Sequence, residues 1–203
     1  MNSDSTTLDR ADRINLYLSV LIAAVAIVLA GWGMVQRLAE VAPGHDISVV
    51  VPLSGEQAPL PLGPDGAPVT VDVETATVVV ADPAPATLFA LWAEPIVQFL
   101  AVAAGMAVAA MFFVRVARGR AFERGTARLV FIGAGILAGS WFLGGMLTTM
   151  TINGAFSAIS NYTYEAGTIP SDLSPAIWIL VLGAVGGALQ LGERLRRDTE
   201  GLV

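Results

Sequence analysis

The sequence predicts a membrane protein of the all-α class, a four-transmembrane-helix bundle with a small extracytoplasmic β-sheet cap inserted between helices 1 and 2. Only 14% of the 203 residues are charged, whereas about 25% are charged in an average soluble domain. Four runs without charge each reach the roughly 20 apolar residues that a helix needs to cross a bilayer. Alternating valines between the first two runs are typical of short β-strands.

The four apolar runs define the expected membrane helices. They begin with "INLYLSVL", "PIVQFLAV", "LVFIGAGI" and "LSPAIWIL", and we expect helices at about residues 14–36, 93–117, 127–150 and 173–192. The first run could instead be a cleaved signal peptide, but the apolar part of such a peptide has about 7–15 residues and precedes a small-x-small site. This run is longer and continues into "GWGMVQRLAE", so we expect an uncleaved anchor. The whole chain, residues 1–203, then forms a single integral membrane domain.

The outer segment at about residues 38–90 is too long for a simple turn. "ISVVVPL" at residues 47–53 predicts a strand, the turn-forming "GPDGAP" follows, and "VTVDVETATVVV" alternates apolar and polar residues. We expect two to four antiparallel strands. Because a lone hairpin is marginal in water, this cap should pack against the second outer loop at residues 151–172, where Tyr162 and Tyr164 are expected packing or contact groups. The cap could sense a ligand or form a structural lid, and the sequence favours the lid.

The positive charges define the expected orientation, since loops rich in Arg stay cytoplasmic. The chain has no Lys, and ten of its eleven Arg residues lie on one side of the predicted spans, with only Arg37 opposite. That inner side carries ten Arg against seven acids, a net charge of +3, and the outer side carries one Arg against ten acids, a net charge of −9. We therefore expect both termini, an Arg loop at residues 115–128 and a tail at residues 193–203 to be cytoplasmic. A chain with Arg only, rich in Ala, Gly and Val, is typical of bacteria, so the expected location is the bacterial inner (plasma) membrane.

The candidate contact residues are the cations of the loop and the tail together with one aromatic side chain. Nucleic-acid binding would use an extended basic surface with aromatic groups for stacking, whereas this loop is fixed to the bilayer at both ends. Anionic lipid attracts such cations by about 1 kcal/mol each. A topology marker in contact with the anionic lipid bilayer is therefore the leading interpretation, and no direct nucleic-acid contact is expected. The candidate partner or lipid contacts are Arg115, Arg118, Arg120, Phe122, Arg124, Arg128, Arg194, Arg196 and Arg197.

Chemistry inside the predicted spans is sparse. The uncharged runs at residues 14–35, 95–114, 129–150 and 173–192 contain no Asp, Glu, His or Arg, the groups that ion-coupled transporters and intramembrane enzymes place at bilayer depth. Thr148, Thr149 and Thr151 are expected to hydrogen-bond between helices, and Glu94 is interpreted as a helix-start acid at the outer interface. With no Cys and with His45 as the single His, no thiolate or His metal cluster can form within one chain. We therefore expect no catalytic residue, no metal and no cofactor.

Small residues form two small-x-x-x-small pairs, Gly135 with Gly139 and Gly183 with Gly187. Such residues let helix backbones approach one another closely in lipid. We favour packing within the four-helix bundle over dimerisation, and the sequence leaves the oligomeric state open.

The order of these features resembles the bacterial membrane protein family called domain of unknown function 2975. The resemblance rests on the four spans, the β-rich first outer segment, the inner loop "ARGRAFERGTARL" and the tail "GERLRRDTEGLV". In that family the inner loop commonly has a Gly, often a Pro, and then a Phe. Gly119 and Phe122 match, while Ala121 stands where Pro is frequent. Members tend to be encoded beside small helix-turn-helix regulators, so the resemblance implies a cytoplasmic helix-turn-helix partner but does not imply an activity.

The sequence thus predicts a non-enzymatic regulatory or signalling protein of the bacterial inner membrane that holds a cytoplasmic partner through the Arg loop and the tail. The tail could form a short docking segment or simply end the last helix at the interface. The alternative function is a transporter or a transporter accessory subunit without ion-coupling charges in the membrane. The uncharged spans argue against ion coupling but allow facilitated passage or an accessory role.

Overall fold

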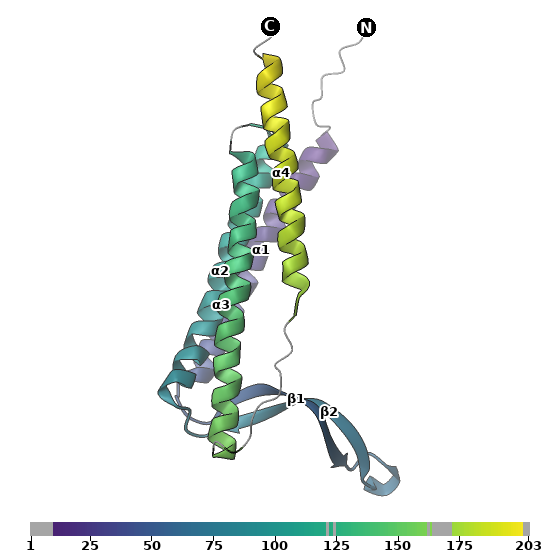
Figure 1. Cartoon of the computed structure of the whole chain (residues 1–203), viewed down its shortest axis with the longest axis vertical. Helices are drawn as coiled ribbons and strands as arrows, with labels where there is room; N and C mark the ends of the chain where they lie inside the picture. The colour runs from purple at the N-terminus through teal and green to yellow at the C-terminus, as the bar shows by residue number, and fades with distance from the viewer. Residues whose placement is uncertain (1–9, 121, 124, 162, 164–171, 201–203) are drawn as a thin grey trace. The chain divides into compact units, whose positions relative to one another are not determined.

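The protein is described from a computed structural model, whose helices and strands are drawn in Figure 1. It divides into two compact units. Unit 1 comprises Met1–Val35, Ile96–Leu143 and Asp172–Val203, and unit 2 comprises Gln36–Pro95 and Gly144–Ser171. The structure describes residues 10–120, 122–123, 125–161, 163 and 172–200. Tyr162 and Tyr164, which the sequence suggests as contact groups, lie outside the described residues.

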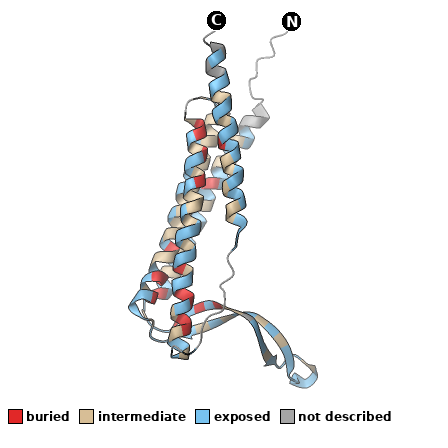
Figure 2. Cartoon of the chain, viewed as in Figure 1, coloured by how far each residue is buried: buried red, intermediate tan, exposed pale blue. Residues whose placement is uncertain are grey.

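Four long helices account for most of the described residues: α1 (Arg10–Val41), α2 (Pro85–Ala117), α3 (Thr126–Ser160) and α4 (Ser174–Glu200). The prediction of four helices long and apolar enough to cross a membrane is confirmed. Between 0% and 17% of the most apolar window in each helix is buried within the chain, and exposed residues run along every helix in Figure 2. Soluble monomers rarely expose this much apolar surface. Apolar surface of this extent is typical of contact with a membrane or with a partner.

The first two helices are longer than the expected spans. α1 covers Arg10–Val41 where residues 14–36 are expected. α2 begins at Pro85, eight residues before the expected start at residue 93. A Pro in the first turn has a backbone angle preset for the helix and has no N–H to leave unpaired, which favours a helix start there.

The last two helices also continue past their uncharged cores. α3 ends at Ser160, so the first part of the loop expected at residues 151–172 is helical instead. Ile152 and Phe156 recur at helical spacing and are buried, which stabilises this extension. α4 continues to Glu200, so most of the tail expected at residues 193–203 is helix rather than a separate segment.

Unit 2 contains the predicted β-hairpin, an antiparallel pair of β1 (Ile47–Leu60) and β2 (Val69–Val80). The register pairs Ile47 with Val80 and Leu60 with Val69, and it is interrupted by a bulge in β1. β1 runs beyond the strand expected at residues 47–53, since both strands of a two-stranded sheet are edges and tolerate the Pro and Gly residues that follow. The hairpin has the smallest number of strands in the predicted range of two to four.

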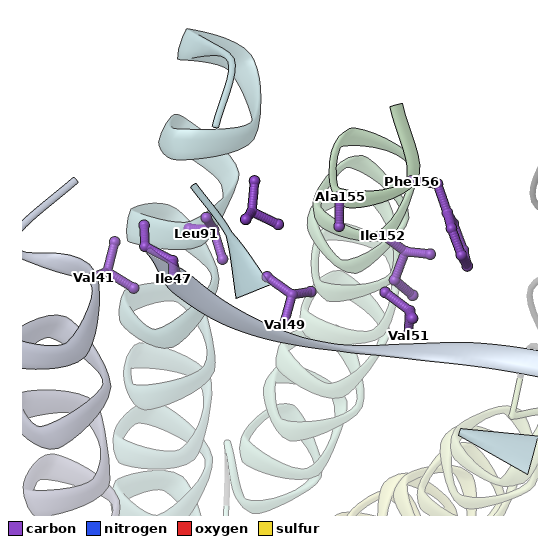
Figure 3. Close-up of a cluster of buried hydrophobic side chains, with 9 residues drawn as sticks. Val41, Ile47, Val49, Val51, Leu91, Ile152, Ala155 and Phe156 are labelled. Carbon is purple, nitrogen blue, oxygen red and sulfur yellow. The ribbon is translucent and has the colours of Figure 1, made fainter. Parts of the chain in front are cut away.

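The core of unit 2 joins the hairpin to the ends of three helices. In the first part of β1, from Ile47 to Val51, every second side chain faces this core, as the two-residue period of a strand requires. Figure 3 shows these strand side chains beside those of α2 and α3. The expected contact with the second outer loop is therefore made by the last turns of α3. The buried residues are Val41, Ile47, Val49, Val51, Val80, Leu91, Ile152, Ala155 and Phe156.

Close helix contacts in unit 1 occur at glycines other than the predicted pairs. A methyl group added at Gly186 would lie 2.9 Å from the Phe131 ring, and one at Gly31 would lie 3.3 Å from the Phe99 ring. These contacts join α3 to α4 and α1 to α2. By contrast, a methyl group at any of the four glycines of the predicted pairs would meet no heavy atom within 4 Å, so the expectation that these pairs pack the bundle is wrong for this chain. They are Gly135, Gly139, Gly183 and Gly187.

Candidate functional site

The C-terminus of α2 fixes the start of the Arg loop through a Schellman motif. Gly119 adopts the left-handed conformation, with φ of +72°, which costs a glycine little. Its N–H donates to the Val116 carbonyl over 2.9 Å, and the Arg120 N–H donates to the Arg115 carbonyl over 2.9 Å. This pattern satisfies carbonyls that the helix end would otherwise leave unpaired. The two hydrogen bonds define how the chain leaves α2.

The loop is also held at the start of α3. Thr126 is fully buried, and its hydroxyl donates to the Arg120 carbonyl over 3.3 Å. The Arg120 side chain forms an ion pair with Glu123 at 3.3 Å. Gly125, with φ of +90°, supplies the turn into the helix. These contacts hold the described residues between α2 and α3 against the start of α3.

α4 completes the loop from the other end of the sequence. The Glu193 carboxylate accepts a hydrogen bond over 3.1 Å from the N–H of Ala127, in the first turn of α3. An acid at a helix N-terminus satisfies a free N–H and interacts favourably with the helix dipole. Beside it, the Phe122 ring packs so closely on Gly192 that an added methyl group would lie 2.8 Å from the ring. The loop and the C-terminal part of α4 therefore contact one another at Gly192 and Glu193, and we call the described residues of 115–128 and 192–200 the loop–tail surface.

The predicted contact residues lie on this surface to the extent that the structure describes them. Phe122 is half exposed, at 50%, although one side of its ring covers Gly192. Arg115 is half-buried, and Arg118, Arg128 and Arg194 are exposed. Among the described side chains, no carboxylate lies within ion-pair distance of any of these four arginines. Arg124 lies outside the described residues, and Arg196 and Arg197 belong to α4 with side chains that the structure does not describe.

Charge is distributed unevenly between the two units. Unit 1 contains ten Arg and eight acids, a net charge of +2, and unit 2 contains one Arg and nine acids, a net charge of −8. The single cation of unit 2, Arg37, pairs with Glu40 at 2.7 Å. The cations available for an anionic or acidic contact therefore lie in unit 1.

An apolar cavity of about 350 Å³ lies between α2, α3 and α4 in unit 1. Within the part of the chain that the structure describes, its lining has no charged side chain. Phe112 and Leu129 contribute to its wall, close in sequence to the two ends of the Arg loop. Val185 is 42% exposed, so the wall formed by α4 is open to the surroundings. The lining residues are Gly105, Val108, Ala109, Phe112, Phe113, Leu129, Val130, Gly133, Leu182 and Val185.

The polar residues of unit 2 form a small cross-helix contact. The Thr148 hydroxyl of α3 donates a hydrogen bond to the Glu94 carboxylate of α2 over 2.7 Å. The hydrogen bond between helices that the sequence predicts for Thr148 is therefore present. Glu94 lies well inside α2, so its interpretation as a helix-start acid is wrong. The Thr151 hydroxyl is buried and has no hydrogen-bond partner among the described residues. Within those residues no group of three or more His, Cys, Asp or Glu side chains could hold a metal ion.

Asp172 precedes α4 and binds its first residue. The Ser174 N–H donates to the Asp172 carboxylate over 2.8 Å. Hydrogen bonds from the Ser174 hydroxyl and backbone N–H hold the pKa of Asp172 below its ordinary value. The exposed carboxylate therefore supports the start of α4.

Sequence reasoning found the cations of the loop–tail surface but missed its internal contacts. Glu193 and Ala127 are 66 residues apart, and neither type of residue signals such a pairing. A Gly followed by an acid at the end of the fourth apolar run was the available sign, because Gly permits a close approach and an acid suits a helix N-terminus.

No protein-family model matches this chain, and no match was found among the curated proteins or the solved structures. The resemblance to the family called domain of unknown function 2975 therefore stays a prediction.

Proposed function

We propose that the protein is a multi-pass protein of the bacterial plasma membrane, with both termini and the Arg loop in the cytoplasm and the β-hairpin outside. The exposed apolar faces of all four helices support the membrane placement. The orientation rests on the Arg residues at the start of α1, in the α2–α3 loop and at the end of α4, since positive loops stay inside.

The proposed role is that of a non-enzymatic regulatory or signalling component that holds a cytoplasmic partner on the loop–tail surface. The observation that carries this proposal is the joining of the loop to α4 by Glu193 and Phe122. A loop needed only as a topology marker would require positive charge alone, whereas this one contacts α4, presents a half-exposed Phe and displays Arg115, Arg118 and Arg128 without a carboxylate partner among the described side chains. Buried aromatic and Arg contacts dominate most protein interfaces, so these are the side chains suited to a partner.

The family resemblance implies the candidate partner, a small helix-turn-helix regulator of the kind that members tend to be encoded beside. The test is a binding measurement between the purified full chain in detergent and a regulator of this kind encoded next to its gene. Phe122→Ala and a pair of substitutions, Arg118→Gln with Arg194→Gln, are expected to weaken binding at least tenfold, about 1.4 kcal/mol. Arg37→Gln, which removes the single cation of unit 2, is the matched control and should bind as the parent does.

A truncation removes most of the tail part of this surface but keeps the contacts that hold the loop against α4. Deleting residues 195–203 keeps Gly192 and Glu193, so the loop should retain its contacts with α4. If the truncated chain and the loop variants bind the regulator as tightly as the full chain does, the regulatory role on this surface is overturned.

The transporter alternative has less support in the described residues. Its best candidate pathway is the cavity of unit 1, but that lining is apolar, and a polar solute would lose its hydration there without compensating hydrogen bonds. An accessory subunit stays compatible with the same surface features. Solute flux in liposomes that survives the loss of residues 195–203 would favour transport over regulation.

A further inference from the structure

The cavity of unit 1 has the size and lining of a site for an alkyl chain. An engineered cavity of about 150 Å³ with Leu, Ile and Phe walls stays dry and binds benzene, and this cavity measures about 350 Å³. Its ten lining residues are apolar or Gly. Water has no hydrogen-bonding side chain to bind there, so a hydrocarbon group is the occupant that the lining favours.

Two Arg residues follow the cavity-lining part of α2 in the chain. Arg115 follows the lining residue Phe112 by three positions on α2, and residues three apart are neighbours on a helix surface. The Arg115 guanidinium reaches the loop, where one of its nitrogens lies 3.4 Å from the position that a methyl group on Gly125 would take. Arg118 follows Arg115 by a further three residues and is exposed. An apolar cavity whose wall helix is followed by two arginines matches an amphiphile with an anionic head.

The acids near these cations already have partners. Glu123 forms an ion pair with Arg120, and Glu193 accepts the Ala127 N–H at the start of α3. Arg115 and Arg118 have no carboxylate within ion-pair distance among the described side chains. An anion from outside the chain is therefore the complement that these two arginines lack.

We infer that one anionic phospholipid binds between α2, α3 and α4, with an acyl chain in the cavity and its phosphate at Arg115 and Arg118. The site differs from general contact with anionic lipid because the cavity selects one chain and the two arginines select one headgroup charge. This inference rests on the proposed membrane placement but not on the proposed cytoplasmic partner.

The test compares phosphatidylglycerol with phosphatidylcholine of the same acyl chains, added to the purified full chain in detergent and counted by native mass spectrometry. The parent chain is expected to retain one phosphatidylglycerol in preference to phosphatidylcholine. Gly105→Leu should abolish that retention, because a side chain at Gly105 enters open space inside the cavity and needs no neighbour to move. Gly33→Leu is the matched control, a helical glycine with equally open surroundings that does not line the cavity.

The headgroup is tested separately from the chain. Arg115→Gln is expected to weaken phosphatidylglycerol binding about fivefold while leaving phosphatidylcholine binding unchanged, as the loss of one cation near anionic lipid implies. Arg37→Gln should leave both unchanged. Should Gly105→Leu fail to fold, as judged by circular dichroism and gel filtration, Ala109→Leu fills the same cavity from the next turn of α2.

Three results would overturn the inference. The parent chain could show no preference for phosphatidylglycerol, the cavity-filling variants could retain it as well as the parent does, or these variants could lose a dimer instead of a lipid, which would assign the cavity to a second copy. If the chain requires no detergent to stay in solution, the membrane placement itself fails, and this outcome is distinct from the other three.

Discussion

At the scale of single residues, Phe122 has two roles. It is a candidate contact for a partner, and its ring also packs on Gly192 of α4. Half of the ring stays exposed while the other side covers the α4 backbone. Any residue with a Cβ at position 192 would occupy space that the ring needs. The glycine therefore determines the position of the aromatic group that the loop presents.

Gly192→Ala is expected to displace the Phe122 ring and to lower the stability of the loop. The added methyl group would lie 2.8 Å from the ring, so the half-exposed ring must move and the loop loses this contact with α4. Hydrogen exchange at residues 118–125 should therefore accelerate. Gly187→Ala is the control, since a methyl group there meets no heavy atom within 4 Å. Unchanged exchange in Gly192→Ala would contradict the packing described.

Asp172 predicts a pH dependence at the start of α4. Its pKa is lowered in the folded chain by hydrogen bonds from Ser174, so its contribution to stability is fully present above the ordinary value of 3.8 and is lost as the pH falls through the lowered value. NMR of the Ser174 amide should show a transition whose midpoint lies below 3.8. Asp172→Asn should abolish that transition, and a midpoint at or above the ordinary value would refute the hydrogen bonds.

At the scale of helices and strands, the hydrogen bond from Thr148 to Glu94 ties α3 to α2 within unit 2. Hydrogen bonds between membrane helices contribute about 0.6 kcal/mol on average, with a maximum near 1.7 kcal/mol. A double-mutant cycle of Thr148→Val and Glu94→Ala is expected to give a coupling energy of about 0.5–1.5 kcal/mol in this range. Thr149→Val, at the exposed neighbouring position, is the control and should show no coupling with Glu94→Ala. Additive effects, within about 0.3–0.5 kcal/mol, would exclude the bond as a stabilising contact.

The existence of the helices could be predicted from the sequence, but their ends could not. Uncharged runs identify the residues that can lie in lipid, whereas a helix ends where its caps and packing stop. α3 continues past residue 150 because Ile152 and Phe156 contact the hairpin, and that contact depends on valines about one hundred residues earlier in the chain. The hairpin itself was predictable since its alternation and its turn residues are local signals.

The candidate site shows the same division. The cations could be identified from the sequence alone, because they are the Arg residues that lie beside the uncharged runs. Two contacts could not be predicted, because each joins residues that are distant in sequence. They are the capping of α3 by Glu193 and the packing of Phe122 on Gly192. The glycine pairs illustrate the opposite error, because a local motif such as Gly135 with Gly139 does not specify which surface of the helix has a neighbour.

At the scale of the whole molecule, the charge distribution predicts the orientation. Reporter fusions at Val203 and in the loop near Gly119 should be active only as cytoplasmic reporters, whereas a fusion at Gly66, in the hairpin turn, should be active only as an exported one. Moving the cations tests whether the Arg residues determine the orientation. We expect a mixed orientation when three Arg are introduced near Gly66 and the loop residues Arg115, Arg118 and Arg120 are changed to Gln. The opposite pattern of reporter activity in the parent chain would reverse the proposed topology.

The hairpin of unit 2 has a consequence for how the protein avoids self-association. Both of its strands are edges, and an unpaired edge can template pairing with another chain and so lead to aggregation. β1 contains Pro52 and Pro59, which have no N–H to offer an incoming strand, and β2 presents the exposed carboxylates of Asp72 and Glu74, which repel a second copy. Prolines and charges on edge strands are the devices by which sheets resist edge-to-edge growth. The hairpin can therefore stay a two-stranded ribbon at high local concentration without another strand to cover it.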